Sequence, residues 1–293
     1  MQTFYRPQGI GIGYRRQYTQ DLIQLAQQQS PNPIQFLELA PENWIKMGGK
    51  AKADFEQVAQ YYPLASHGLS LSLGGIEPLN VAYLKQIRQF LDHFKIQFFS
   101  EHTSFCEHGG HVYDLMPFPF TAQSVENFAD RVKQSQDILG RQIAIENTSY
   151  YIRFPNSTLD EVDFLNAVMH KSDCLLHLDV NNIYVNATNH QDISADDFLN
   201  RIDLSRACYI HIAGHDVEQD TQGKPLLIDT HGQAVCADVW QILSQVYERT
   251  GKIIPTVLER DFNLPPFADI LQEVQQIEHW QRHALSSFSQ QNI

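Results

Sequence analysis

The stretch from Ile143 to Asp179 reads IAIENTSYYIRFPNSTLDEVDFLNAVMHKSDCLLHLD. Two short apolar runs, Ile143–Glu146 and Leu175–Asp179, flank an amphipathic segment at Glu161–His170. This order predicts two parallel strands that are joined by a crossover helix. Both predicted strands end on a carboxylate, at the edge of the sheet where the loops to the helices begin.

The same alternation of apolar runs and amphipathic segments continues along the whole chain. We predict eight strands, at Gly9–Tyr14, Phe36–Ala40, Leu64–Gly68, Ile96–Ser100, Ile143–Glu146, Leu175–Asp179, Tyr209–Ala213 and Ile254–Leu258. We predict one helix after each strand, at Asp21–Gln29, Ala53–Tyr62, Asn80–Phe94, Gln123–Leu139, Glu161–His170, Ala195–Ile202, Val239–Arg249 and Phe267–His283. Strict alternation implies parallel strands, and eight units are the number that closes a TIM barrel. The predicted fold is therefore an α/β protein with a single (β/α)8 barrel at residues 1–286, followed by a polar tail at 287–293.

An open, doubly wound sheet is the alternative α/β architecture. Such sheets often carry a dinucleotide-binding fingerprint of the form GxGxxG. The nearest match, GIGIG from Gly9 to Gly13, has the wrong glycine spacing. The sequence therefore favours the closed barrel.

The composition limits the partners that the protein can have. With 21 basic and 34 acidic side chains, the formal net charge is −13, which disfavours nucleic acid as a partner. We find no signal peptide and no apolar stretch that is long enough to span a membrane. The four cysteines form no CxxC pair, and we expect a protein of the reducing cytoplasm.

Side chains that can ligate metal ions recur where the predicted strands end and in the loops that follow. They are His67, His102, Glu146, Asp179, Asn182, His211, His215, Asp229, His231 and Glu259. Any one of them has a simpler explanation as a hydrogen-bonded loop residue or a helix cap. In a barrel, however, all of these junctions face one mouth. Burying so many carboxylates and imidazoles together is costly, and bound divalent cations are the simplest compensation.

The alternation of side chains along a strand refines this set, because only every second residue points into the barrel. Glu101 and His102 cannot both face inward, and we expect His102 to be the ligand. His177 shares the inward direction with Asp179 but lies one layer deeper, so we expect a core residue or one that supports the ligands, rather than a ligand. Glu38 in the second predicted strand, with Glu42 and Asn43 after it, is expected to support the ligands or contact the substrate.

The number of candidate ligands predicts more than one ion. A catalytic ion takes about three protein ligands and keeps an open position, so this set would serve two or three ions. We expect Glu146 to bridge two of them, and Glu146, Asp179 and His215 to take part in catalysis. Imidazole and carboxylate ligands without cysteine suit iron, manganese or zinc.

Several motifs resemble one known family over nearly the whole chain and in the same order. They are GIGYR from Gly11, ELAPENW from Glu38, SHGLS from Ser66, SEH from Ser100, IEN from Ile145, LDVNN from Leu178 and HIAGH from His211. They resemble the multinuclear non-haem iron-dependent oxidases, of which the methanobactin-maturing oxidase is the best-known member. These are TIM-barrel proteins of the xylose isomerase-like superfamily.

The resemblance implies a barrel with two or three iron ions that uses oxygen to modify a residue, often cysteine, in a ribosomally made peptide. It also implies a separate partner protein that presents the peptide. The metal ligands that it implies are His67, His102, Glu146, Asp179, Asn182, His211, Asp229, His231 and Glu259, with His215 as a further position.

Two other readings remain open at this point. Apurinic endonucleases and sugar isomerases share the barrel type and would make the protein a metal-dependent hydrolase or isomerase. The endonucleases have a histidine where this chain has Asn182, and no lysine ends a predicted strand, as an isomerase would require. A non-catalytic metal-binding protein would show saturated coordination with no open position.

Overall fold

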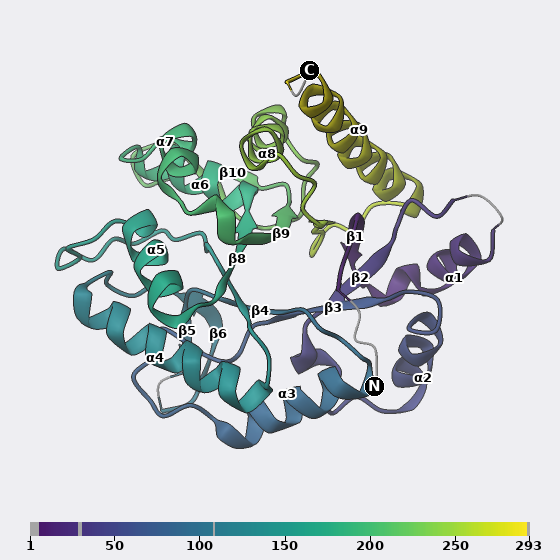
Figure 1. The fold of residues 1–293 in the computed structure, drawn as a ribbon, viewed down its shortest axis with the longest axis horizontal. Coiled ribbons are helices and arrows are strands. Elements are labelled where there is room, and N and C mark those ends of the chain that lie inside the picture. Colours follow the sequence, from purple (N-terminus) through teal and green to yellow (C-terminus); the bar gives the residue numbers. More distant parts are fainter. Residues whose placement is uncertain (1–5, 29–30, 108, 292–293) are drawn as a thin grey trace.

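The computed structural model describes residues 6–28, 31–107 and 109–291 and contains a closed barrel of eight parallel strands (Figure 1). The strands, in the order in which they pair around the barrel, are β1 (Ile10–Gly13), β12 (Thr256–Leu258), β9 (Ala207–Ile212), β8 (Leu175–Asp179), β7 (Ala144–Glu146), β4 (Phe99–His102), β3 (Leu64–Gly68) and β2 (Phe36–Leu39). The predicted TIM barrel is confirmed.

Helices surround the barrel, and each predicted helix is present within a few residues of its expected bounds. They are α1 (Thr19–Gln27), α2 (Gly49–Val58), α3 (Val81–His93), α4 (Ala122–Leu139), α5 (Glu161–Ser172), α7 (Ala195–Arg201), α8 (Ala237–Thr250) and α9 (Phe267–Gln291). Local sequence sets their ends: Thr121 accepts a hydrogen bond from the Ser124 amide at the start of α4, and Gly251 ends α8 with φ of 64°. Helix α9 continues to Gln291, so most of the stretch expected as a frayed tail is helical.

The structure adds elements that the sequence pattern did not predict. Helix α6 (Val180–His190) starts directly after β8, with Asp179 as its N-cap. Its four asparagines have low helix propensity, which is why it was missed. Two hairpins, β5–β6 (Phe105–Glu107 and His111–Met116) and β10–β11 (Asp216–Gln219 and Pro225–Ile228), lie in the loops after β4 and β9. Three short 3-10 helices, η1 (Arg16–Tyr18), η2 (Pro41–Asn43) and η3 (Leu204–Arg206), complete the connections.

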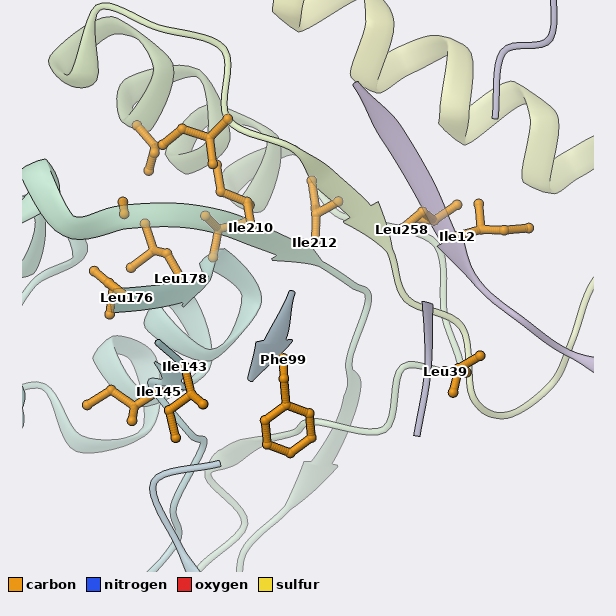
Figure 2. Packing of buried hydrophobic residues seen from close by; sticks show 14 of the residues in the cluster. Ile12, Leu39, Phe99, Ile143, Ile145, Leu176, Leu178, Ile210, Ile212 and Leu258 are labelled. Carbon is orange, nitrogen blue, oxygen red and sulfur yellow. The ribbon is translucent and has the colours of Figure 1, made fainter. Parts of the chain in front are cut away.

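The barrel packs apolar side chains on both faces of its strands. The outward-facing residues form the large core under the helices (Figure 2) and include Ile12, Leu39, Phe99, Ile145, Leu176, Leu178, Ile210, Ile212 and Leu258. Inside the barrel, a smaller cluster contains Phe36, Ala65, Tyr209 and Val257. Gly11 makes room for this cluster, because a Cβ at this position would lie 2.5 Å from the Phe36 ring. This inner apolar layer forms the floor on which the functional site rests.

Candidate metal centre

The next inward-facing layer of the barrel is polar. Two residues beyond each member of the inner apolar cluster lies an ionisable side chain: Glu38, His67 and His211 within their strands, and Glu259 directly after β12. These side chains, with His102 and Glu146 on β4 and β7, lie at the C-terminal ends of the strands, where barrel enzymes bind their substrates. Because side chains alternate along each strand, the inward-facing positions above the apolar layer form a ring of groups that can bind metal ions. We call this set the donor ring.

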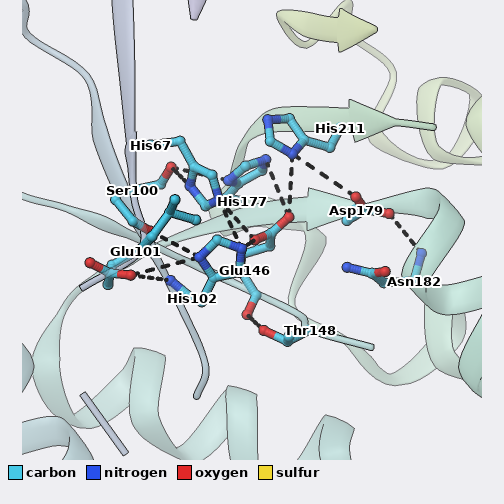
Figure 3. Close-up of polar contacts among 12 residues, drawn as sticks. His67, Ser100, Glu101, His102, Glu146, Thr148, His177, Asp179, Asn182 and His211 are labelled. Atoms are coloured by element: carbon cyan, nitrogen blue, oxygen red, sulfur yellow. Dashed lines mark hydrogen bonds and ion pairs between the residues drawn. The ribbon is translucent and has the colours of Figure 1, made fainter. Parts of the chain in front are cut away.

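One part of the ring is a triangle of three donor atoms (Figure 3). His67 Nε2 and His102 Nε2 are 3.2 Å apart, and each is 3.1 Å from Glu146 Oε2. Ligands that sit about 2.1 Å from one ion and near right angles to each other lie about 3 Å apart, so this spacing fits a shared ion. His102 Nδ1 donates to the Gly68 carbonyl 2.9 Å away, which turns its Nε2 toward Glu146. A lone pair that faces a carboxylate oxygen needs a proton or a metal ion between them.

A second group of donors surrounds His211 on β9. Its Nδ1 lies 2.9 Å from Glu259 Oε2 and 3.3 Å from Glu146 Oε1. Its Nε2 lies 2.9 Å from the carboxylate of Glu38. The two oxygens of Glu146 thus face different donor groups, which is the arrangement expected of a bridging carboxylate.

A third group lies in the loops after β11 and β12. His231 Nε2 is 2.7 Å from Asp229 Oδ1, and His231 Nδ1 is 3.5 Å from Glu259 Oε2. Asp261 Oδ2 lies 3.2 Å from the same Nδ1, a contact that sequence reasoning missed because Asp261 is beyond the strand end. His231 has a φ of 53°, a left-handed conformation that a non-glycine residue holds only where its surroundings enforce it.

Several buried nitrogen and oxygen atoms of this ring make no well-aligned hydrogen bond among the described residues, although Glu146 Oε2, His211 Nδ1 and His231 Nε2 lie 2.7–3.1 Å from oppositely charged groups. These atoms are Glu146 Oε2, His177 Nε2, Asp179 Oδ2, Asn182 Oδ1, His211 Nδ1 and His231 Nε2. Buried polar atoms are nearly always paired, so a convergent set of unpaired ones indicates a missing partner. All six are nitrogen or oxygen ligand atoms, and the donor set therefore fits metal ions.

The charges of the ring lead to the same conclusion. Five carboxylates, those of Glu38, Glu146, Asp179, Asp229 and Glu259, face five imidazoles, those of His67, His102, His177, His211 and His231. Two or three divalent cations would balance about this much negative charge while the imidazoles stay neutral.

In the absence of metal ions, protons must balance the negative charge of the ring, and the pKa values of its groups are shifted accordingly. Burial by itself raises the pKa of Glu146, but the neighbouring His102 and His67 outweigh it and hold that pKa well below its usual range. Burial lowers the pKa of His102, yet the charge of Glu146 raises it to about 9. Burial, with Glu146 and Asp229 nearby, raises the pKa of Asp179 well above normal.

The structure moves one residue from the place that sequence reasoning gave it. His177 was expected to be a core or supporting residue, one layer below Asp179, rather than a ligand. In the tilted barrel, however, β8 is staggered so that His177 pairs with Glu146 of β7 rather than lying beneath it. Its ring centroid is 4.0 Å from that of His211, and it belongs to a donor group with His67, Glu146 and His211.

Two of the expected ligands sit differently from the rest. Asn182 donates its side-chain amide to the Asn147 carbonyl and leaves its oxygen at the donor ring. His215 is half-buried, and its Nδ1 lies 2.7 Å from Asn181 Oδ1. Asn181 in turn donates to Asp229 Oδ1, so His215 contacts the ring through Asn181.

The donor ring opens into a cavity of about 530 Å³. His102, Glu146, Asn182, Asp229, His231 and Glu259 line it on the barrel side. Exposed apolar side chains line its entrance: Leu69, Tyr151, Ile152 and Phe262. No lysine is among the described residues that line it, so the lysine expected near the metal ions of a sugar isomerase has no counterpart among them.

Fold and donor set together define a class of protein: a barrel of the xylose isomerase-like kind with a site suited to metal ions at its mouth. A xylose isomerase-like TIM barrel protein from Mycobacterium smegmatis in complex with magnesium superimposes with a TM-score of 0.59 at 12% identity, covering 97% of this chain and 100% of that one. L-ribulose 3-epimerase superimposes with a TM-score of 0.57 at 12% identity, covering 97% of this chain and 96% of that one. At this identity the likeness shows the fold alone.

The chain belongs to the MbnB/TglH/ChrH family of RiPP precursor modification enzymes, whose sequence model matches residues 9–282. RiPPs are ribosomally synthesised peptides that are modified after translation. A UPF0276 protein of Haemophilus influenzae is 48% identical over 295 residues, covering 94% of this chain and 95% of that protein. A UPF0276 protein of Neisseria meningitidis serogroup C is 50% identical over 277 residues, covering 94% and 96%. The resemblance inferred from the motifs is confirmed.

Proposed function

We propose that this protein is an iron-dependent, oxygen-using enzyme that oxidises a cysteine in a ribosomally made peptide. The family supports a peptide substrate, and the observation that carries the rest is the set of unpaired donor atoms around Glu146. Nitrogen and oxygen ligands without thiolate suit non-haem iron that must keep positions open. Oxygen would accept the electrons and protons that the peptide residue loses.

The residues of the ring would divide the work of holding two or three ions. His67, His102 and Glu146 Oε2 would hold one ion. His211, Glu259 and Glu146 Oε1 would hold a second ion. A third ion would be held by Asp179, Asn182, Asp229 and His231. Bound iron would supply one-electron chemistry with oxygen and Lewis acidity toward a thiol.

The cavity above the ring would bind and orient the peptide. Its apolar entrance, with Ile152 and Phe262, excludes water from the reacting residue once a peptide is bound. The hydroxyl of Tyr151 accepts a hydrogen bond from the Asp229 amide at 2.8 Å and fixes the loop that carries Asp229. A separate partner protein would present the peptide, as the resemblance to the family implies.

We also propose a cellular setting for the enzyme. In the part of the chain that the structure describes, no helix has the length and apolar character to cross a membrane. All four cysteines are free, which suits a reducing compartment. We place the enzyme in the cytoplasm, where its peptide substrate would be made.

The test is to load the protein with Fe²⁺ without oxygen, add a cysteine-containing peptide encoded beside the gene and its candidate partner, and admit oxygen. The proposal expects oxygen consumption and a change in peptide mass that both require iron. A Cys→Ser peptide should keep its mass. A peptide of unchanged mass with iron confirmed bound would overturn the proposal, and activity with zinc toward a phosphoester would favour a hydrolase.

A further inference from the structure

A second, smaller cavity lies beside the metal-centre cavity, where α5 begins. Its volume is about 220 Å³. The two cavities share Pro117, Tyr150 and Ile152 as lining residues. A peptide whose reacting residue lies over the donor ring therefore passes close to the entrance of this side cavity.

The walls of the side cavity are aromatic. Phe118, Phe120 and Tyr150 line it, and Phe118 meets Phe120 edge to face with ring centroids 5.5 Å apart. Phe120 also stacks on Phe164 of α5 with centroids 4.6 Å apart, which holds the wall in place. Walls of this kind accept the aliphatic part of a long side chain and favour a cation above the ring faces.

The polar end of the side cavity is acidic. Asp160 is paired with Arg201 at 2.6 Å, and Asp192 is paired with Arg153. Glu161 is buried, with 6% of its surface exposed, and no ion pair to it occurs among the described residues. Among the described residues, Asn186 Nδ2 donates a hydrogen bond to the Glu161 carboxyl group at 3.3 Å.

This burial has a measurable consequence for Glu161. Desolvation raises the pKa of its carboxyl group to about 8, and the nearby Asp192 and Asp160 add to the shift. A buried carboxylate without a counter-charge is unfavourable, and a cation beside it would remove the penalty. At the N-terminus of α5, the Asp160 side chain accepts a hydrogen bond from the Asp163 amide.

We propose that the side cavity binds a basic side chain, lysine or arginine, of the peptide whose neighbouring residue lies over the donor ring. This rests on the proposed function for the presence of a peptide. The stem of the basic side chain lies against Phe118, Phe120 and Tyr150, and its cation pairs with Glu161. Asp160 and Asp192 in the lining are already paired with Arg201 and Arg153, so Glu161 is the carboxyl group that a new cation would pair with.

The test measures peptide binding separately from chemistry. Fluorescent peptides of equal length, each with one cysteine and with Lys, Gln, Glu or Leu on either side of it, are titrated into iron-loaded protein without oxygen. We expect the best Lys peptide to bind about tenfold more tightly than its Gln counterpart, the effect of one charge-assisted hydrogen bond. Glu161→Gln should abolish this preference and leave the iron content unchanged.

Two further variants complete the design. Asp192→Asn, at the partly exposed rim, leaves Arg153 unpaired and should weaken the Lys preference without affecting folding. Glu56→Gln on α2, which removes an exposed ion pair with Lys52, is the matched control and should leave the preference intact. Wild-type protein without a preference for Lys or Arg, or a Glu161→Gln variant that keeps it, would overturn the proposal.

The outcomes separate this inference from the proposed function. A Lys preference that depends on Glu161, without any oxidation of the peptide, would support the side cavity and refute the iron and oxygen chemistry. If the Lys, Gln and Glu peptides bind with equal affinity and are oxidised at equal rates, the iron and oxygen chemistry would be supported and the side-cavity proposal refuted.

Discussion

His67 Nε2 and His102 Nε2 lie 3.2 Å apart across the mouth of the barrel, each in contact with the same oxygen of Glu146. Two imidazole nitrogens hold this position against a carboxylate only when a proton or a metal ion lies between them. Without metal, Glu146 raises the pKa of His102 to about 9 against the opposing effect of burial, so His102 is protonated at neutral pH.

Metal binding must therefore displace protons. We predict that loading the metal-free protein at pH 7 releases protons, and that the apparent affinity for Fe²⁺ rises as the pH approaches about 9. Calorimetric titrations in buffers of different ionisation enthalpy would measure the number of protons released. Loading without proton release would contradict the account of the triangle.

Glu146 should be the residue on which metal occupancy depends most. Because its two oxygens face different donor groups, Glu146→Gln should lose more than one equivalent of metal and all activity. The barrel should still fold, since the apolar layer below the ring does not include Glu146. Metal analysis and circular dichroism would test both statements, with Glu248→Gln on α8 as the control. Full occupancy in Glu146→Gln would refute the bridging role.

His211 and His215 should differ, although His211 lies near the end of β9 and His215 lies in the loop directly after it. His211 contacts Glu38, Glu146 and Glu259 directly, whereas His215 contacts Asn181. We expect His211→Gln to lose metal, and His215→Gln to keep it with an activity loss of about tenfold, the effect of losing one positioning hydrogen bond. Equal metal loss in the two variants would make His215 a ligand.

Glu161 should make the stability of the fold depend on pH. Burial raises its folded pKa to about 8, above the unfolded value near 4.5, so its contribution is most favourable at low pH and is lost as the pH rises through 8. Asp160, Asp192 and Arg153 face the same cavity and are unchanged in Glu161→Gln. This variant should therefore lose less unfolding free energy than wild type between pH 5 and 8, as measured by denaturant unfolding. Parallel pH profiles for the two proteins would contradict the shift.

Much of the fold and the ring could be predicted because both follow from the period of the strands. Eight apolar runs predicted the barrel, and the inward alternation placed His102 rather than Glu101 beside Glu146. The position of His177 beside Glu146 was not predictable, because it depends on the stagger between β7 and β8 and not on the sequence of either strand.

Other features depend on contacts between distant segments. Asp261 reaches His231 only because its loop folds back over the barrel, where Arg15 also binds it. Helix α6 forms in spite of its asparagines because they hydrogen-bond to neighbouring loops: Asn182 to Asn147, and Asn186 to Thr148. The side cavity next to Glu161 arises from such long-range packing and has no signature in sequence.

The most direct test of the central claim is the metal content of the protein. Protein produced with ample iron and purified without oxygen should carry two or three iron ions per chain by elemental analysis. The donor groups around Glu146, His211 and His231 predict this number, because each group can hold an ion. A ratio of one ion or none per chain, in folded protein prepared in this way, would contradict the account.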